Sequence, residues 1–210
     1  MDWATAASMA TAVGTLVLAI ATFVSVRSAN RAARVAERTL LAGIRPLMVP
    51  SRRQDPEQKV GFADNRWVHV PGGEAATDVS DEAIYLVISL RNVGSGLGVL
   101  HGWRFTAERL LGGDDEHAPL DQFRRLARDL YIPASDMGWW QGAFRDPSEP
   151  DFAAARDAVA ARQPMTIELL YGDYEGGQRV ISRFTLIPAG EDRWLASVSR
   201  HWNIDRPDPR

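Results

Sequence analysis

WATAASMATAVGTLVLAIATFVSV, residues 3–26, contains no charged side chain. At about 1.5 Å of rise per residue, a helix of this run is roughly 36 Å long, which crosses a hydrocarbon core of roughly 30 Å with some tilt. Its second half, residues 13–26, is apolar on all faces, whereas a soluble amphipathic helix keeps a polar face. The sequence therefore predicts one membrane-spanning helix that contacts the lipid bilayer through residues 3–26.

Two other interpretations of residues 3–26 remain open. The small-x-small pattern Ala19-Ile20-Ala21 suggests a signal peptide, but signal peptides carry their basic residues before the apolar run, and here only the α-amino group and Asp2 precede it. The alanine-rich, mildly apolar first half suggests a buried core helix instead. We favour the membrane span, because the basic cluster follows the run and the second half has no polar face.

Basic residues follow the uncharged run directly. Between residues 27 and 53 the single acid is Glu37, and the first four basic residues are Arg27, Arg31, Arg34 and Arg38. Arginines beside a span are retained on the cytoplasmic side. We therefore expect a single-pass protein of the cell membrane, with its N-terminus outside and its C-terminal domain in the cytoplasm.

The helix is expected to continue beyond the span as an Arg-rich neck. Residues 1–45 then form one segment, which Gly43 and Pro46 end. The arginines of the neck are expected to attract anionic lipid headgroups. A homodimer through this helix is an open alternative, because Ala6, Ala10 and Gly14 form a small-x-x-x-small pattern.

Charge is divided unevenly along the chain. Residues 1–45 contain five Arg against Asp2 and Glu37, a balance of +3, and the rest contains 19 basic and 25 acidic residues, a balance of -6, which gives the total of -3. An acidic domain lacks the basic face that nucleic-acid binding needs. The chain has no cysteine, which fits a reducing compartment without requiring one.

Residues 46–202 show strand-like alternation, strongest in AIYLVISLR at residues 83–91. Two helices are predicted within an insertion at about residues 119–163: one from the spacing of Leu120, Phe123, Leu126 and Leu130, the other from about residue 150 to residue 163. We therefore expect a mainly β fold, a roughly seven-stranded immunoglobulin-like β-sandwich with two inserted helices, and a disordered tail at residues 203–210. The candidate strands are residues 45–50, 67–70, 83–91, 99–110, 165–171, 179–187 and 194–199.

Glycine and asparagine mark two turns of this domain. Asn92, Gly94 and Gly96 follow the strongest strand, and Gly176 and Gly177 lie between two later strands. These residue types adopt the positive φ angles that tight turns need. They are therefore predicted to be structural turn residues.

Three short motifs give the chain a resemblance to known proteins. They are Arg45-Pro46-Leu47-Met48, Leu90-Arg91-Asn92-Val93-Gly94-Ser95-Gly96 and Tyr171-Gly172-Asp173-Tyr174-Glu175-Gly176. With the N-terminal span, they resemble a loose group of uncharacterised bacterial single-pass membrane-anchored proteins. The resemblance implies a small β-sandwich on a membrane tether and implies no activity. The group usually has Pro-Ala where this chain has Leu97-Gly98.

No motif in the sequence predicts a catalytic, cofactor or metal site. The histidines are dispersed, no cysteine is available as a zinc ligand, and the run from Asp114 to His117 lacks EF-hand spacing. The glycines from Gly94 to Gly98 lie between two strands, whereas a dinucleotide fingerprint joins a strand to a helix. Asp173 and Glu175 fall in a turn, and no serine has a nucleophile elbow. We therefore expect no enzyme activity.

Met137-Gly138-Trp139-Trp140-Gln141-Gly142-Ala143-Phe144 is the segment that suggests binding. It is predicted to be a loop between the two helices, and in an extended segment adjacent tryptophans point in opposite directions. An exposed tryptophan is typical of an interface. Trp139, Trp140 and Phe144 are therefore candidate partner-binding residues, with burial of both tryptophans beneath the helices as the alternative.

These observations favour a membrane-tethered protein-interaction module at the cytoplasmic face, with an unknown protein as its partner. The alternative is an accessory or regulatory subunit of an integral membrane complex, such as a transporter or channel, in which the span itself packs against the larger protein. A hydrolase on a membrane stalk would need a polar pocket that the sequence does not show.

Overall fold

The computed structural model describes residues 2–110 and 116–206 of the chain, which divides into two compact units, Met1–Ala42 and Gly43–Arg210. The first unit is almost entirely α1 (Trp3–Gly43), so the predicted long N-terminal helix is confirmed. By length and composition α1 can span a membrane. Its hydroxyl groups donate to carbonyls one turn back, as Thr11 does to Ala7 at 3.0 Å and Thr22 to Leu18 at 2.8 Å. Such bonds satisfy polar groups within the helix, as lipid requires.

The second unit is mainly β, as predicted, with one further α-helix. Its elements are β1 (Met48–Pro50), β2 (Gln58–Gly61), β3 (Trp67–Val70), β4 (Glu74–Val79), β5 (Ile84–Asn92), β6 (Gly98–Thr106), the 3₁₀ turn η1 (Leu120–Gln122), β7 (Arg124–Ile132), β8 (Met137–Phe144), α2 (Pro150–Ala160), β9 (Met165–Gly172), β10 (Val180–Ala189) and β11 (Arg193–Asn203).

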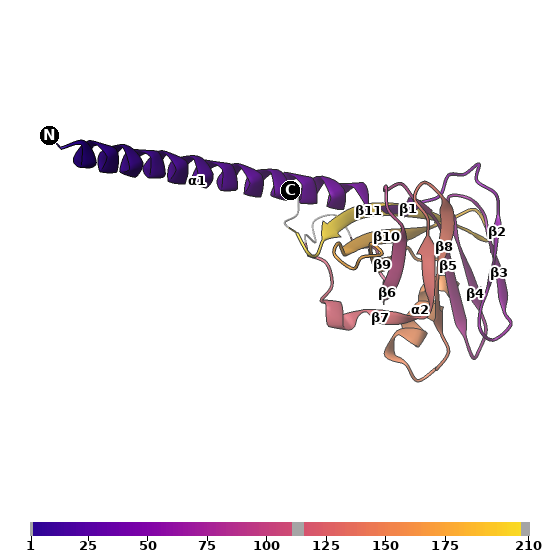
Figure 1. The fold of residues 1–210 in the computed structure, drawn as a ribbon. Coiled ribbons are helices and arrows are strands. Elements are labelled where there is room, and N and C mark those ends of the chain that lie inside the picture. Colours follow the sequence, from indigo (N-terminus) through magenta and orange to yellow (C-terminus); the bar gives the residue numbers. More distant parts are fainter. Residues whose placement is uncertain (1, 111–115, 207–210) are drawn as a thin grey trace. The chain divides into compact units, whose positions relative to one another are not determined.

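Nine of these strands form one curled antiparallel sheet, drawn in Figure 1. Its order is β1-β5-β4-β11-β10-β9-β6-β7, and β8 pairs with the other edge of β5. β2 and β3 form a separate hairpin. Because nine strands belong to one sheet, the two-sheet immunoglobulin-like arrangement is not borne out.

Two hydrophobic clusters hold this unit together. The main cluster lies inside the curl and includes Trp103, Trp140, Phe144 and Phe184. A smaller cluster joins the β2–β3 hairpin to the other face of β5, where Phe62 meets Tyr85 edge to face with ring centroids 4.7 Å apart. The hairpin therefore covers part of the outer face of the curled sheet.

Several predicted elements are wrong. Residues 119–132 form η1 and the strand β7 instead of a helix, and residues 137–144 form the strand β8 instead of a loop. The strands β2 and β4 were not among those predicted. The second predicted helix is present as α2, with Pro150 in its first turn. In the predicted tail, Asn203 belongs to β11 and Asp205 accepts from the Arg179 backbone at 2.7 Å, while residues 207–210 lie outside the described residues.

Candidate functional site

A cavity of about 160 Å³ lies between β7 and β8. Among the described strands, β7 pairs only with β6 and β8 only with β5, so these consecutive strands meet without a shared hydrogen-bond ladder. Ile132 packs on Gly138 near the turn that joins them, where an added Cβ would lie 2.8 Å from its Cγ1. Farther from the turn, a cavity separates the two strands. We call it the arginine cavity because its lining includes Arg124, Arg125, Arg128 and Arg145.

β7 supplies a continuous stretch of the lining, residues 124–128, together with Leu130. The pairing of β7 with β6 shifts register over this stretch, since Leu130 pairs with Leu100 and Arg125 with Gly102. Arg124 is fixed at one end by an ion pair with Glu149, and its guanidinium lies 5.1 Å from the Trp103 ring centroid. The strand thus places Arg124, Arg125 and Arg128 at a cavity whose lining also includes Trp103 and Leu130.

Arg128 links three elements at the cavity. Its Nη2 donates to the Gln141 side-chain oxygen of β8 at 2.6 Å and to the Gly61 carbonyl of β2 at 2.8 Å. The same Gln141 oxygen accepts from Trp139 Nε1 at 3.1 Å. These two acceptors hold the Arg128 side chain in place, but both are neutral oxygens and do not compensate its positive charge.

Arg145 is neutralised by a carboxylate. Its Nε donates to Asp64 at 3.0 Å, and the Tyr85 hydroxyl donates to the same oxygen at 2.6 Å. Burial of Asp64 opposes its ionisation, but these two hydrogen bonds outweigh that effect and lower the pKa of the carboxyl below its ordinary value. Burial and the bond to Asp64 raise the pKa of Tyr85, so the tyrosine stays a donor.

The lining of the arginine cavity has a defined chemical character. Guanidinium groups and one amide supply hydrogen-bond donors, and tryptophan, phenylalanine and leucine supply apolar surface. No carboxylate, imidazole or hydroxyl side chain is among the described residues that line it. The described lining thus combines positive charge with apolar surface, and none of its side chains is a nucleophile or a general base.

The candidate partner-binding residues lie on β8 and do not form one exposed surface. Trp140 and Phe144 are fully buried in the main cluster, so the interpretation of these two side chains as a partner surface is corrected. The reason is that residues 137–144 form a strand whose even positions face the interior. Trp139 points to the opposite side, is half-buried and packs on both clusters. Gln141, one residue beyond the pair, lines the arginine cavity together with Gly142 and Ala143.

The topology-determining arginines lie on α1. Arg27, Arg31, Arg34 and Arg38 are all exposed, and Arg34 Nε donates to the Asn30 carbonyl at 3.2 Å. Their predicted contact with headgroups and their effect on orientation remain predictions.

Asn92, Gly94 and Gly96 lie at the β5–β6 connection, as predicted. The predicted reason for its two glycines, a positive φ angle, is wrong. Neither glycine has a positive φ. A Cβ on Gly96 would instead lie 1.8 Å from the Ile44 carbonyl oxygen, and one on Gly94 2.3 Å from that of Arg45. Asn92 is fully buried, and its side-chain amide donates to the carbonyls of Gly96 and Ile132. Close backbone approach thus requires the glycines here, whereas Gly176 does have a positive φ of 75° and Gly177 does not.

The remaining chemical candidates are dispersed or buried. His69 Nδ1 lies 2.6 Å from a Glu57 carboxylate oxygen, and His117 Nδ1 lies 2.7 Å from the Ala118 carbonyl oxygen. Asp173 is buried and accepts from Gly177 and Gln178 within its turn. Asp114 and Asp115 lie outside the described residues. Among the residues that the structure describes, no group of three or more His, Cys, Asp or Glu side chains is placed to hold a metal ion.

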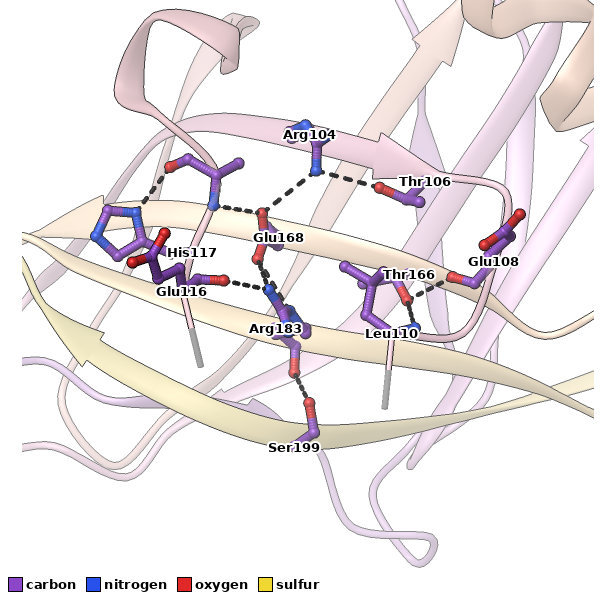
Figure 2. Close-up of polar contacts among 11 residues, drawn as sticks. Arg104, Thr106, Glu108, Leu110, Glu116, His117, Thr166, Glu168, Arg183 and Ser199 are labelled. Atoms are coloured by element: carbon purple, nitrogen blue, oxygen red, sulfur yellow. Dashed lines mark hydrogen bonds and ion pairs between the residues drawn. The ribbon is translucent and has the colours of Figure 1, made fainter. Parts of the chain in front are cut away.

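A buried ion pair that sequence reasoning missed lies at mid-sheet. Glu168 on β9 and Arg183 on β10 are cross-strand partners, 1% and 4% exposed, with Arg183 Nη2 2.8 Å from Glu168 Oε1. Figure 2 shows Glu168 between Arg104 and Arg183, and Arg183 also donates to the Glu116 carbonyl at 2.8 Å. The only signal in the sequence was a charged residue in the middle of each of two apolar strands.

Glu168 and Thr166 of β9 bond to residues on the two sides of 111–115. Glu168 accepts from the Ala118 backbone at 3.2 Å, while the Thr166 hydroxyl donates to the Glu108 carbonyl at 2.7 Å and accepts from the Leu110 backbone at 3.1 Å (Figure 2). Both flanks of residues 111–115 are therefore attached to β9. Because its polar groups are satisfied within the chain, we assign this cluster a structural role.

A second buried chain of hydrogen bonds joins Tyr171, Ser182 and His201. The Ser182 hydroxyl lies 2.7 Å from that of Tyr171 and 2.6 Å from His201 Nδ1. Burial raises the pKa of Tyr171 to about 12. Ser182 is fully buried, so its contact with a histidine does not present a nucleophile to a substrate.

No protein-family model, curated protein or solved structure matches this chain, so the resemblance to bacterial membrane-anchored proteins stays a prediction.

Proposed function

We propose that this protein is a single-span membrane protein that holds a β-rich binding domain at the cytoplasmic face. The observation that carries the proposal is the composition of α1, in which the uncharged residues 3–26 are followed directly by Arg27, Arg31, Arg34 and Arg38. An apolar helix of this length is stable across a bilayer, and the arginines favour retention of its C-terminal side in the cytoplasm. Each arginine near an anionic membrane surface adds about 1 kcal/mol of attraction.

The domain's role in this proposal is to bind a protein at the inner face. Support comes from the arginine cavity, whose lining suits binding, and from the edges of β7 and β8, which pair with one neighbour each. A strand edge without a partner is a common docking position for an extended segment of another protein. Phe144 and Trp140 have no part in this surface, because both are buried.

A second candidate function is that of an accessory subunit, in which α1 packs against a larger membrane protein. The feature that favours it is the small-x-x-x-small spacing of Ala10 and Gly14 on α1, which allows another helix to approach closely. Replacing residues 3–26 with an unrelated apolar span distinguishes the two: the interaction module keeps its partner, and the accessory subunit loses it.

Deleting residues 3–26 is expected to move the protein from the membrane to the soluble fraction. The full chain should resist extraction from membranes by alkaline carbonate, because a spanning helix is held by the hydrophobic effect and not by charge. Fractionation followed by immunoblotting measures the membrane-bound and soluble amounts of the deletion variant and of the carbonate-treated full chain. The variant with an unrelated span is the matched control and should stay in the membrane. Release of the full chain by carbonate would contradict the proposal.

A further inference from the structure

The arginine cavity carries positive charge that the carboxylates of the described residues neutralise only in part. Of its four arginines, Arg124 has Glu149 and Arg145 has Asp64 as a carboxylate partner. Arg128 donates only to neutral oxygens in the contacts described above. Arg125 is exposed and has no hydrogen-bond or ion-pair partner among the described residues. Two positive charges at the cavity thus lack a carboxylate partner among the described residues.

The size and floor of the cavity limit what it can hold. A cavity of roughly 150 Å³ admits a benzene ring, whereas drug-sized ligands occupy about 300 Å³ or more. The arginine cavity has about 160 Å³ and includes Trp103, Leu126 and Leu130 in its lining. It therefore suits a ligand with one ring or a short chain, with its apolar part toward these side chains.

We propose that the arginine cavity binds a small organic oxyanion, a carboxylate or phosphate on a compact apolar group. Arg125 and Arg128 supply the charge, because guanidinium groups match the planar or tetrahedral oxygens of such anions. Trp103 and Leu130 supply the apolar contact. Gln141 and Gly61 already hold Arg128, so part of the ordering cost of binding has been met before the ligand arrives.

This inference goes beyond the proposed function and does not depend on the orientation of the span. Its test is calorimetric titration of the full chain in an uncharged maltoside detergent. The probes are benzoate, phenyl phosphate and the neutral analogue benzyl alcohol. Saturable binding is expected for the two anions, with benzyl alcohol at least roughly ten-fold weaker, because a charge-assisted hydrogen bond is worth about a factor of ten or more.

Variants locate the binding. Arg125→Ala is the decisive one, since Arg125 holds nothing else in place, and it should weaken binding of both anions roughly ten-fold. Arg128→Ala should do the same, provided that its thermal unfolding shows an intact domain. The matched control is Arg53→Ala, an exposed arginine that does not line the cavity, which should bind as the unaltered chain does.

A lipid headgroup offers the same phosphate chemistry as a soluble ligand. Titration of phenyl phosphate with phosphatidylglycerol added to the micelles distinguishes these sources: competition indicates a headgroup, and unchanged affinity indicates a soluble oxyanion. The proposal is overturned if neither benzoate nor phenyl phosphate saturates, if benzyl alcohol binds equally well, or if Arg53→Ala weakens binding as much as Arg125→Ala.

Discussion

Glu168→Leu is expected to lower the free energy of unfolding by about 3–5 kcal/mol, because it removes the carboxylate that neutralises a buried arginine. Arg183 is 4% exposed, and both its Nε and its Nη2 lie within 2.9 Å of Glu168 Oε1. Leucine fills much of the space of the glutamate side chain. The loss of unfolding free energy therefore reports the missing negative charge more than a change in packing volume. Urea denaturation of the full chain in an uncharged detergent, followed by tryptophan fluorescence, gives the value.

Two comparisons separate this effect from general damage to the sheet. Adding Arg183→Met to Glu168→Leu should recover much of the loss, because an apolar pair no longer leaves a buried charge without its counterion. Asp157→Ala breaks a largely exposed pair with Arg156 and should cost at most about 1 kcal/mol. A loss below about 1 kcal/mol for Glu168→Leu alone would show that the pair is not buried as described.

Trp140→Ala is expected to destabilise the domain by about 3–5 kcal/mol, the usual cost of truncating a large buried aromatic side chain. The Trp140 ring is fully buried and meets Trp103 edge to face with centroids 5.3 Å apart. Its Nε1 has no hydrogen-bond acceptor among the described residues, so the loss comes from packing alone. The same denaturation measurement applies.

Trp67 provides the matched control for this variant. It is 56% exposed on the β2–β3 hairpin, and Trp67→Ala should cost well below the Trp140→Ala value, about 1 kcal/mol or less. Equal stability of Trp140→Ala and the unaltered chain would instead favour the original hypothesis that Trp140 belongs to an exposed partner surface.

The elements that depend on local patterns were predictable. α1 follows from an uncharged run and the arginines after it, and β5 from an almost unbroken apolar stretch that is buried on both faces. Pro150 indicated the start of α2 correctly. These signals lie within a few residues of the structure they specify, so no knowledge of the rest of the fold was needed.

β7 was mistaken for a helix because of the residues that line the cavity. Residues 124–128 line the cavity where the register with β6 shifts, and Arg124, Arg125 and Arg128 interrupt the apolar alternation that predicts a strand. What remained, Leu120, Phe123, Leu126 and Leu130, happens to match helical spacing. The local pattern therefore failed at the candidate site, where charged side chains occupy positions that packing alone would make apolar.

β8 was mistaken for a loop because it lies between two segments predicted to be helices, and its glycines are explained by packing within the strand. A Cβ on Gly142 would lie 2.6 Å from the Trp140 ring and 3.1 Å from that of Trp103, so glycine is required by the packing of the two tryptophans. That requirement comes from tertiary packing, so the local sequence around Gly142 does not reveal it. The prediction that Trp139 and Trp140 point in opposite directions holds in the strand, since Trp140 faces the interior and Trp139 the hairpin side. The cavity itself depends on how β7 and β8 meet, which no local pattern specifies.

The most direct test of the central claim, a single-span protein with a cytoplasmic domain, is the side of the membrane on which the C-terminus lies. Two C-terminal fusions measure it, one to an enzyme active only outside the cytoplasm and one to a protein that fluoresces only inside. Fluorescence without enzyme activity is the predicted result, and changing Arg27, Arg31, Arg34 and Arg38 to alanine should reduce that bias. Enzyme activity without fluorescence would place the domain outside and contradict the account.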